Sequence, residues 1–291
     1  MRLLAGCALV LIVSAVPARA ASSRLTLDGP GATRPGHQVT FTGRLAGQPH
    51  ARVGIYLGSS VVAWTTTDGG GFFVARPHLY TSGDYRARAP GAVSPPQHVR
   101  IVRPLLRKGA SSSGVQALVR RLAALGYAVH SRTTTEFTGA VRQSVYAFQK
   151  AQGIAVDGIV GPETRAALRD PVPVVARHAS PADHIEVDTG RQLVLIVRGG
   201  EVRTIVNTST AGIPGYHTPH GTFHVFRRVR GIDTSPLGKL YDPLYFHRGY
   251  AIHGSTNVPP YPASHGCVRV PIWEAARLFE SVPHGETVYV Y

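Results

Sequence analysis

Hydrophobic and polar residues alternate over short runs through the first third of the chain. Runs that alternate, or that are rich in β-branched and aromatic residues, cover residues 38–43, 51–57, 61–64, 72–74 and 83–88. A strong turn signal, Asp68-Gly69-Gly70-Gly71, separates two of these runs. Because short strands with frequent turns are typical of β-sandwiches, we predict an N-terminal β-sandwich module over residues 21–103.

The pattern becomes helical after Arg103-Pro104. Apolar residues recur at helical spacing in two runs, Val115, Leu118, Val119 and Leu122, and then Ala140, Val141, Val145 and Phe148. Gly161-Pro162 forms a turn that opens a last short helix, with Pro162 in its first turn. Residues 104–170 are therefore predicted to be a small helical domain.

Strands return beyond a proline-containing linker, residues 171–182. The β-rich runs cover residues 184–187, 192–197, 201–206, 222–226 and 287–291. Gly199-Gly200 predicts a hairpin between two of them, and residues 272–279 predict a short helix. Residues 183–291 are thus expected to form a mostly β domain, and the whole chain is predicted to be multi-domain and mainly β.

The N-terminus has the features of a secretory signal peptide over residues 1–20. Met1-Arg2 supplies a positive start, an apolar run extends from Leu3 to Val16, and Ala18-Arg19-Ala20 provides a small-x-small cleavage site. The apolar run is too short to span a bilayer comfortably, so we expect secretion into the extracytoplasmic space and cell wall, with no stable membrane span after cleavage. A retained N-terminal anchor is the alternative. Cys7 precedes most of the apolar run, which disfavours a lipoprotein site.

The chain is strongly basic, and this limits its partners. It has 31 Lys and Arg residues against 16 Asp and Glu, a formal net charge of +15, and almost all the positive charge is arginine. A basic surface suits an anionic cell-wall matrix, a membrane surface or nucleic acid. No basic helix, zinc finger or aromatic RNA-binding signature is present, so nucleic acid is not an expected partner. Arginine richness from genomic base composition explains the charge equally well.

Candidate chemistry is concentrated in one hexapeptide, Ser264-His265-Gly266-Cys267-Val268-Arg269, which follows His253-Gly254. Cleavage of the signal peptide would remove Cys7 and leave Cys267 without a disulfide partner. An unpaired thiol in an oxidising compartment indicates reactive chemistry or an intermolecular bridge, while a buried inert cysteine is the plain alternative. A thiol attacks as its thiolate, so a neighbouring base is needed, and either His253 or His265 can supply it.

The neighbours of Cys267 have further candidate roles. Backbone N–H groups of Gly266 and Cys267 can form an oxyanion hole if their turn points them outward. Arg269 can bind a substrate carboxylate, lower the pKa of the thiol, or make a structural ion pair. Ser264 can hydrogen-bond a catalytic histidine or shape the turn. Tyr250 and Gly254 are pocket-wall candidates by position alone.

A second group of histidines, His217, His220, His224 and His247, raises the possibility of a metal site. Thr218-Pro219 breaks any helix that would align them, and no carboxylate accompanies them in a recognised ligand pattern. We therefore expect neither a metal nor another cofactor, and we place these histidines at the edge of a substrate groove or on the surface.

Two segments of the chain resemble non-catalytic modules. Thr66 to Phe73 resembles a stretch of bacterial immunoglobulin-like modules, for which a spacer or docking role is the default expectation. Residues 105–168 resemble the three-helix peptidoglycan-binding module, through Val115-Gln116-x-Leu118, Ala147-Phe148-Gln149 and the stretch Asp157 to Thr164. That resemblance implies attachment to the glycan–peptide mesh, whereas a helical spacer without a ligand is the alternative.

The C-terminal region from Asp183 resembles the L,D-transpeptidase catalytic domain of the YkuD type. The matching motifs run in the family's order: Asp188 to Leu193, Ser209-Thr210, Thr218 to Phe223, Tyr250 to Gly254, and Ser264 to Arg269. Ala211 stands where a glycine is usual, and Asp242-Pro243 stands where Met-Pro is common. Neither departure affects the nucleophile, although Asp242 is expected to alter the mouth of the site.

The resemblance implies a cysteine-dependent enzyme that acts on peptidoglycan stem peptides. Cys267 would attack the L,D-peptide bond of a tetrapeptide donor stem and release D-alanine, and an amine of an acceptor stem would resolve the thioester into a 3→3 cross-link. The resemblance also favours His253 as the base, with His265 in a supporting role. Alternatives are an L,D-carboxypeptidase that uses water as acceptor, a non-catalytic wall-binding scaffold, and a metal-dependent wall hydrolase.

Overall fold

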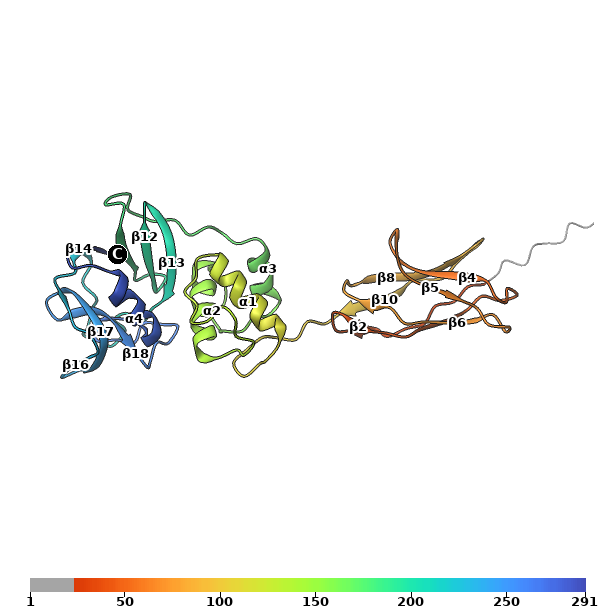
Figure 1. Ribbon diagram of the computed structural model, residues 1–291, viewed down its shortest axis with the longest axis horizontal. Coiled ribbons are helices and arrows are strands. Elements are labelled where there is room, and N and C mark those ends of the chain that lie inside the picture. The colour runs from red at the N-terminus through yellow and green to blue at the C-terminus, as the bar shows by residue number, and fades with distance from the viewer. Residues whose placement is uncertain (1–23) are drawn as a thin grey trace, which may run out of the picture. The chain divides into compact units, whose positions relative to one another are not determined.

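The computed structural model describes residues 24–291 and divides into two compact units, the first ending at Pro104 and the second spanning Leu105–Tyr291 (Figure 1). Across these residues the chain is mainly β with four helices. The expected signal peptide and Cys7 lie outside the described residues. No helix within residues 24–291 is long and apolar enough to cross a membrane.

The first unit contains strands β1 to β10: β1 (Ala32–Thr33), β2 (His37–Gln38), β3 (Phe41–Arg44), β4 (Arg52–Leu57), β5 (Ser60–Thr66), β6 (Phe72–Ala75), β7 (His78–Leu79), β8 (Gly83–Ala89), β9 (Ala92–Val93) and β10 (Gln97–Ile101). One sheet has the order β1-β10-β8-β4-β5 with β9 beside β8, and β2–β7 and β3–β6 form separate pairs. Buried residues of these strands, including Phe41, Ile55 and Tyr85, share one core. The predicted turn before β6 is present, with Asp68 Oδ1 accepting from the N–H groups of Gly70 and Phe72.

The second unit begins with helices α1 (Ser113–Ala124), α2 (Gly139–Ala151) and α3 (Pro162–Arg169). The four periodic apolar residues of α1 are all buried, as their spacing predicts. Thr138 caps α2 by accepting a hydrogen bond from the Val141 N–H, and Pro162 opens α3. The core of these helices also contains Leu193, Leu195 and Ile205, so helices and strands of this unit share one hydrophobic cluster.

The strands of the second unit form two five-stranded sheets, joined by α4 (Ile272–Ser281). The first has the order β13-β12-β11-β20-β14: β11 (His184–Asp188), β12 (Leu193–Arg198), β13 (Glu201–Asn207), β14 (Gly221–His224) and β20 (Thr287–Val290). The second has the order β15-β17-β18-β19 with β16 on β17: β15 (Arg227–Arg228), β16 (Ile232–Ser235), β17 (Gly238–His247), β18 (Tyr250–Ser255) and β19 (Val268–Pro271). The predicted hairpin turn between β12 and β13 is confirmed, because Gly199 and Gly200 both have positive φ.

Candidate active site

The parallel pairing of β18 and β19 places His253 and Cys267 on one face of their sheet. Ile252 pairs with Val268, and His253 pairs with Arg269, so Cys267 immediately precedes the paired stretch. Successive side chains of a strand point to opposite faces. Ile252 and Val268 enter the hydrophobic core. His253, Arg269 and Cys267 therefore share the opposite face, with His253 beside Arg269 and diagonal to Cys267.

The turn before Cys267 requires a glycine and a buried hydroxyl. Gly266 has a φ of +127°, and a Cβ at this position would lie 2.4 Å from Tyr250 Cε1. Ser264 is only 1% exposed. Its Oγ accepts from the Gly266 N–H at 3.0 Å and donates to the Cys267 carbonyl at 2.7 Å. Ser264 thus shapes the turn, and the Gly266 N–H, one of the two expected oxyanion donors, is already engaged.

His253 is buried and is held in one tautomer. The residue is only 6% exposed, and its Nδ1 lies 2.9 Å from the Gly254 carbonyl oxygen. A carbonyl only accepts, so Nδ1 carries the proton and Nε2 keeps its lone pair. Burial lowers the pKa of His253 to about 4; the Gly254 carbonyl opposes this, and the charge of Arg269 adds to it. At neutral pH His253 is therefore an uncharged base.

The Cys267 thiol is also uncharged at neutral pH. Burial raises the pKa of the Cys267 thiol, although the Ala251 N–H and the positive charge of Arg269 both act in the opposite direction. The thiol lies 3.7 Å from the Gly249 carbonyl, to which it donates. Arg269 lowers the pKa of the thiol, as expected from the sequence, but burial raises this pKa by more.

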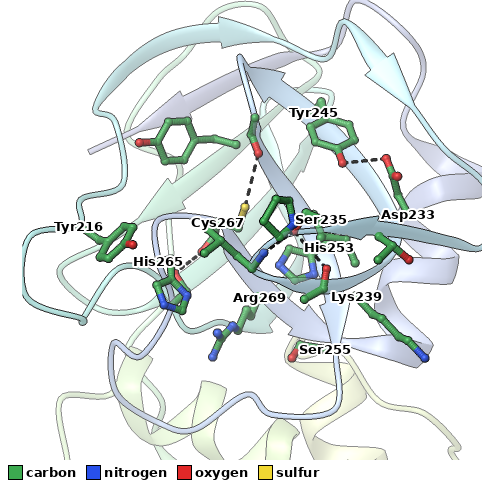
Figure 2. Close-up of a pocket in the computed structure, with 18 of the residues that line it drawn as sticks. Tyr216, Asp233, Ser235, Lys239, Tyr245, His253, Ser255, His265, Cys267 and Arg269 are labelled. Carbon is green, nitrogen blue, oxygen red and sulfur yellow. Dashed lines mark hydrogen bonds between the residues drawn. The ribbon is translucent and has the colours of Figure 1, made fainter.

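A groove of about 690 Å³ opens over this face, and both Cys267 and His253 line it (Figure 2). Four basic side chains line it as well: Arg227, Lys239, Arg248 and Arg269. Asp233 is the one acidic residue among the lining residues, and its Oδ2 accepts from Arg227 at 2.8 Å and from the Tyr245 hydroxyl at 2.9 Å. The groove therefore favours anionic ligands.

One wall of the groove comes from the hairpin β16–β17, which the sequence pattern did not reveal. Tyr245 packs beside Cys267 in a small cluster, and its hydroxyl points to Asp233 on the side of the groove shown at upper right in Figure 2. Burial, with the nearby Asp233 carboxylate, raises the pKa of Tyr245 to about 12. The sequence signal that could have indicated this hairpin is the turn-rich stretch Ser235 to Gly238 between two short polar runs.

The remaining candidate residues separate into lining and structural groups. His265 lines the groove on the other side, edge-on to Tyr216 with ring centroids 4.7 Å apart (Figure 2). Tyr250 also lines the groove, under Gly266. Gly254 is not a lining residue: a Cβ there would lie 3.0 Å from the Ala275 Cβ in α4, so this glycine allows the helix to approach the sheet.

Family models match both parts of the second unit. The L,D-transpeptidase catalytic domain (YkuD) matches residues 182–290, and a peptidoglycan binding domain matches residues 111–168. A solved L,D-transpeptidase from Xylanimonas cellulosilytica is 37% identical to this chain with a TM-score of 0.61, and the match covers 65% of this chain and 98% of that one. The chain belongs to the L,D-transpeptidase family.

Two further proteins are similar to part of this chain. An L,D-transpeptidase from Stackebrandtia nassauensis is 23% identical with a TM-score of 0.40, over 64% of this chain and 94% of that one. The N-acetylmuramoyl-L-alanine amidase CwlL of Bacillus licheniformis is 46% identical over 65 residues, which are 22% of this chain and 18% of the amidase. The chain thus spans less than a fifth of the length of that amidase.

The two departures from the family pattern have local structural roles in this family member. Asp242 has a φ of +47°, and its Oδ1 accepts from the Gly231 N–H at 2.7 Å within a bulge of β17. Asp242 is not among the groove-lining residues, so the expectation that it alters the mouth of the site is wrong. Ala211 donates its N–H to Thr218 Oγ1, and the close approach to the Pro262 carbonyl falls on the following Gly212.

The four histidines outside the motif do not converge on one point. His220 meets Thr189 Oγ1 at 3.2 Å, His224 meets Thr287 Oγ1 at 3.5 Å, and the rings of His217 and His247 both lie near Tyr250. Within residues 24–291 no group of three or more His, Cys, Asp or Glu side chains is arranged to hold a metal ion. None of these four is a lining residue of the groove, but His217 and His247 flank it through Tyr250, and His220 and His224 are exposed.

Proposed function

We propose that this protein is a cysteine-dependent L,D-transpeptidase that acts on peptidoglycan stem peptides through a thioester and forms 3→3 cross-links. The observation that carries this proposal is the placement of Cys267 and His253 on one face of β18–β19, inside the groove. A thiol and a neutral imidazole on one face form a nucleophile–base pair. Family membership supports the same reaction class.

The first half-reaction forms the thioester. The Cys267 sulfur attacks the carbonyl carbon of the L,D-peptide bond of a donor tetrapeptide, and its proton passes to Nε2 of His253. The C–N bond then breaks, and His253 returns the proton to the nitrogen of the departing D-alanine. Because the Gly266 N–H is bound by Ser264, the Cys267 N–H is the proposed donor to the oxyanion.

The second half-reaction transfers the acyl group. An amine of an acceptor stem attacks the thioester carbonyl and loses a proton to His253, and the C–S bond breaks as His253 returns that proton to the Cys267 sulfur. Water in place of the amine would give L,D-carboxypeptidase activity. We propose that the basic side chains of the groove hold the free carboxylates of the stems, with Arg269 closest to the reacting atoms.

The location proposed for this reaction is the extracytoplasmic cell wall, after cleavage of a signal peptide at residues 1–20. The peptidoglycan-binding family match over residues 111–168 supports attachment to the wall, aided by the excess of basic over acidic residues on an anionic matrix. We propose that the β unit ending at Pro104 is an immunoglobulin-like spacer or docking module.

Incubation of the full chain with defined tetrapeptide muropeptides, followed by mass spectrometry of the products, tests this function. We expect cross-linked dimers and released D-alanine. Tripeptide monomers alone would indicate a carboxypeptidase. If folded protein forms no product, both enzymatic functions are contradicted. Cys267→Ser and His253→Ala should each abolish turnover, whereas His224→Ala, an exposed histidine outside the groove, should not.

The two candidate bases are separated by a second pair of variants. If His265→Ala abolishes turnover while His253→Ala retains it, the assignment of His253 as base is wrong. Turnover that survives Cys267→Ser and is lost with a chelator would support a metal-dependent hydrolase instead. Pelleting of the inactive Cys267→Ser chain with purified sacculi tests wall attachment, and no retention would contradict it.

A further inference from the structure

A buried lysine joins the helical segment to the start of β12 and the end of β13. Lys150, in the last turn of α2, is only 7% exposed. Its Nζ donates to the Gln192 carbonyl at 3.0 Å, to Asn207 Oδ1 at 2.5 Å and to the Thr208 carbonyl at 2.9 Å. All three protons of the ammonium group are therefore bound by acceptors from residues 192–208.

No carboxylate accompanies this buried cation among its hydrogen-bond partners. Burial lowers the pKa of Lys150 to about 7, while the three oxygen acceptors favour its protonated form. An apolar side chain of similar volume would avoid this desolvation. The three hydrogen bonds thus have a role beyond the filling of space between helix and sheet.

The segment that Lys150 holds is hydrogen-bonded to the Cys267 turn. Thr208 Oγ1 donates to the Arg269 carbonyl at 2.7 Å, and Ser209 exchanges two backbone hydrogen bonds of 3.1 Å with Arg269. The Thr210 carbonyl accepts from the Ala263 and Ser264 N–H groups, both at 2.9 Å. Residues 208–210 therefore contact the chain on both sides of Cys267.

A second residue on the same helix face contacts a loop next to the groove. Gln143 lies seven residues before Lys150, two helical turns away, so the two share a face of α2, the helix beside β13 in Figure 1. Its Oε1 accepts from Asn207 Nδ2 at 2.5 Å, and its Nε2 donates to the Val258 carbonyl at 3.0 Å. Asn257, the neighbour of Val258, lines the groove.

We propose that this face of α2 is part of the catalytic unit and that Lys150 is a positioning residue for Cys267. The peptidoglycan-binding segment then does more than attach the enzyme to its substrate. It holds residues 207–210, and these hold the strand and turn that present the thiol. This inference rests on the proposed function for its turnover readout, but the order of the Cys267 turn can be measured without turnover.

The test compares Lys150→Met with two controls in the full chain. Methionine has similar length but donates no hydrogen bond, so we expect kcat to fall at least tenfold with little change in KM. Lys108→Met, at an exposed lysine of the same segment, should leave kcat unchanged. Val119→Ala, in the buried core of α1, lowers the stability of the same segment without touching residues 207–210, and it should leave kcat of the folded protein within twofold.

Two readouts are independent of the enzymatic reaction. Amide hydrogen exchange at residues 208–210 and 269 should accelerate in Lys150→Met and not in Val119→Ala. The rate at which iodoacetamide alkylates Cys267 should change at least threefold in Lys150→Met. If the wild-type chain proves to have no transpeptidase activity, these two measurements still decide the positioning role.

Two results would overturn the proposal. The first is a folded Lys150→Met chain with kcat within twofold of wild type and unchanged exchange at residues 208–210. The second is an equal loss of kcat in Val119→Ala at an equal loss of Tm, which would show that general stability, and not this contact, controls the site. Should Lys150→Met fail to fold, Gln143→Ala provides the same test, with about a threefold fall in kcat and faster exchange at Asn207 expected.

Discussion

The proton state of the Cys267–His253 pair is open to direct test. Many cysteine nucleophiles are activated by a preformed thiolate beside an imidazolium. Here burial disfavours the charged form of both groups: it lowers the pKa of His253 to about 4 and raises the pKa of the Cys267 thiol. We therefore expect a neutral thiol beside a neutral imidazole, with the proton transferred only as the sulfur attacks.

The size of this effect follows from the two pKa values. The pKa of the thiol lies above its ordinary value of 9.0 and that of His253 is about 4, so proton transfer between them without substrate is uphill by at least about 7 kcal/mol. Even two charges as close as about 4 Å would gain only about 4 kcal/mol from their attraction in an effective dielectric of about 20, which offsets part of this. At least about 3 kcal/mol remains, so the ion pair should make up less than about 1% of the protein.

The pH dependence of Cys267 alkylation by iodoacetamide measures the thiolate fraction. We expect the rate to rise about tenfold for each pH unit from pH 6 to 8, without a plateau. Peptide mass spectrometry identifies the labelled residue, because Cys7 is the other cysteine in the chain. In His253→Gln, which replaces one neutral group by another, the midpoint of this rise should stay within about half a pH unit while turnover is lost.

A preformed ion pair would give a different result in both measurements. Alkylation would then be fast and flat between pH 5 and 8, and His253→Gln would move the thiol midpoint upward by more than a unit, because the stabilising imidazolium is lost. Either outcome would refute the argument that burial controls the pair. Cys267→Ser, which should show no labelling at this position, is the control for specificity.

Three further predictions concern residues that support the site. Gly266→Ala, at φ +127° and with its Cβ 2.4 Å from a Tyr250 ring atom, should lower turnover at least tenfold, while Gly139→Ala, whose Cβ meets nothing within 4 Å, should not. Ser264→Ala leaves the Gly266 N–H without its partner and should lower the free energy of unfolding by about 1–3 kcal/mol in urea denaturation. Glu274 is 3% exposed, and burial raises its pKa to about 7 from 4.5, so the folded state binds the extra proton and stability falls as pH rises through that interval. Glu274→Gln should remove this fall, about 3 kcal/mol between pH 4.5 and 7.5, and an unchanged pH profile of unfolding would contradict the assignment.

Local patterns predicted the four helices and the strands of the first catalytic sheet, but none of the strands β15 to β19. The spacing of Val115, Leu118, Val119 and Leu122 predicted α1 because one helix face is buried, and paired glycines predicted the β12–β13 turn because both need positive φ. The hairpin β16–β17 was missed because Asp242-Pro243 interrupts its pattern. In the structure a bulge absorbs this interruption, with Asp242 at positive φ, and β17 continues to His247.

The relation between the helical segment and the catalytic strands is a tertiary property. The change in composition near residues 171–182 predicts a linker, and nothing local to Lys150 or Gln143 indicates that their partners lie more than forty residues away. Leu193, Leu195 and Ile205 enter the same hydrophobic cluster as α1 and α2. This shared core exists because β12, a continuous apolar run, buries residues on both of its faces, as do the last residues of β13.

The sequence by itself determined which residues are candidates: Cys267 in a specific motif, His253 ahead of it, and a glycine where the turn needs one. Only the tertiary structure decided how they act. The parallel register of β18 and β19 brings together residues whose separation along the chain leaves their contact undetermined. Burial then sets the proton state of both groups, and burial depends on everything packed around them. The Ser264 hydroxyl removes the Gly266 N–H from the set of free donors, because a hydrogen bond depends on distances that residue types do not specify.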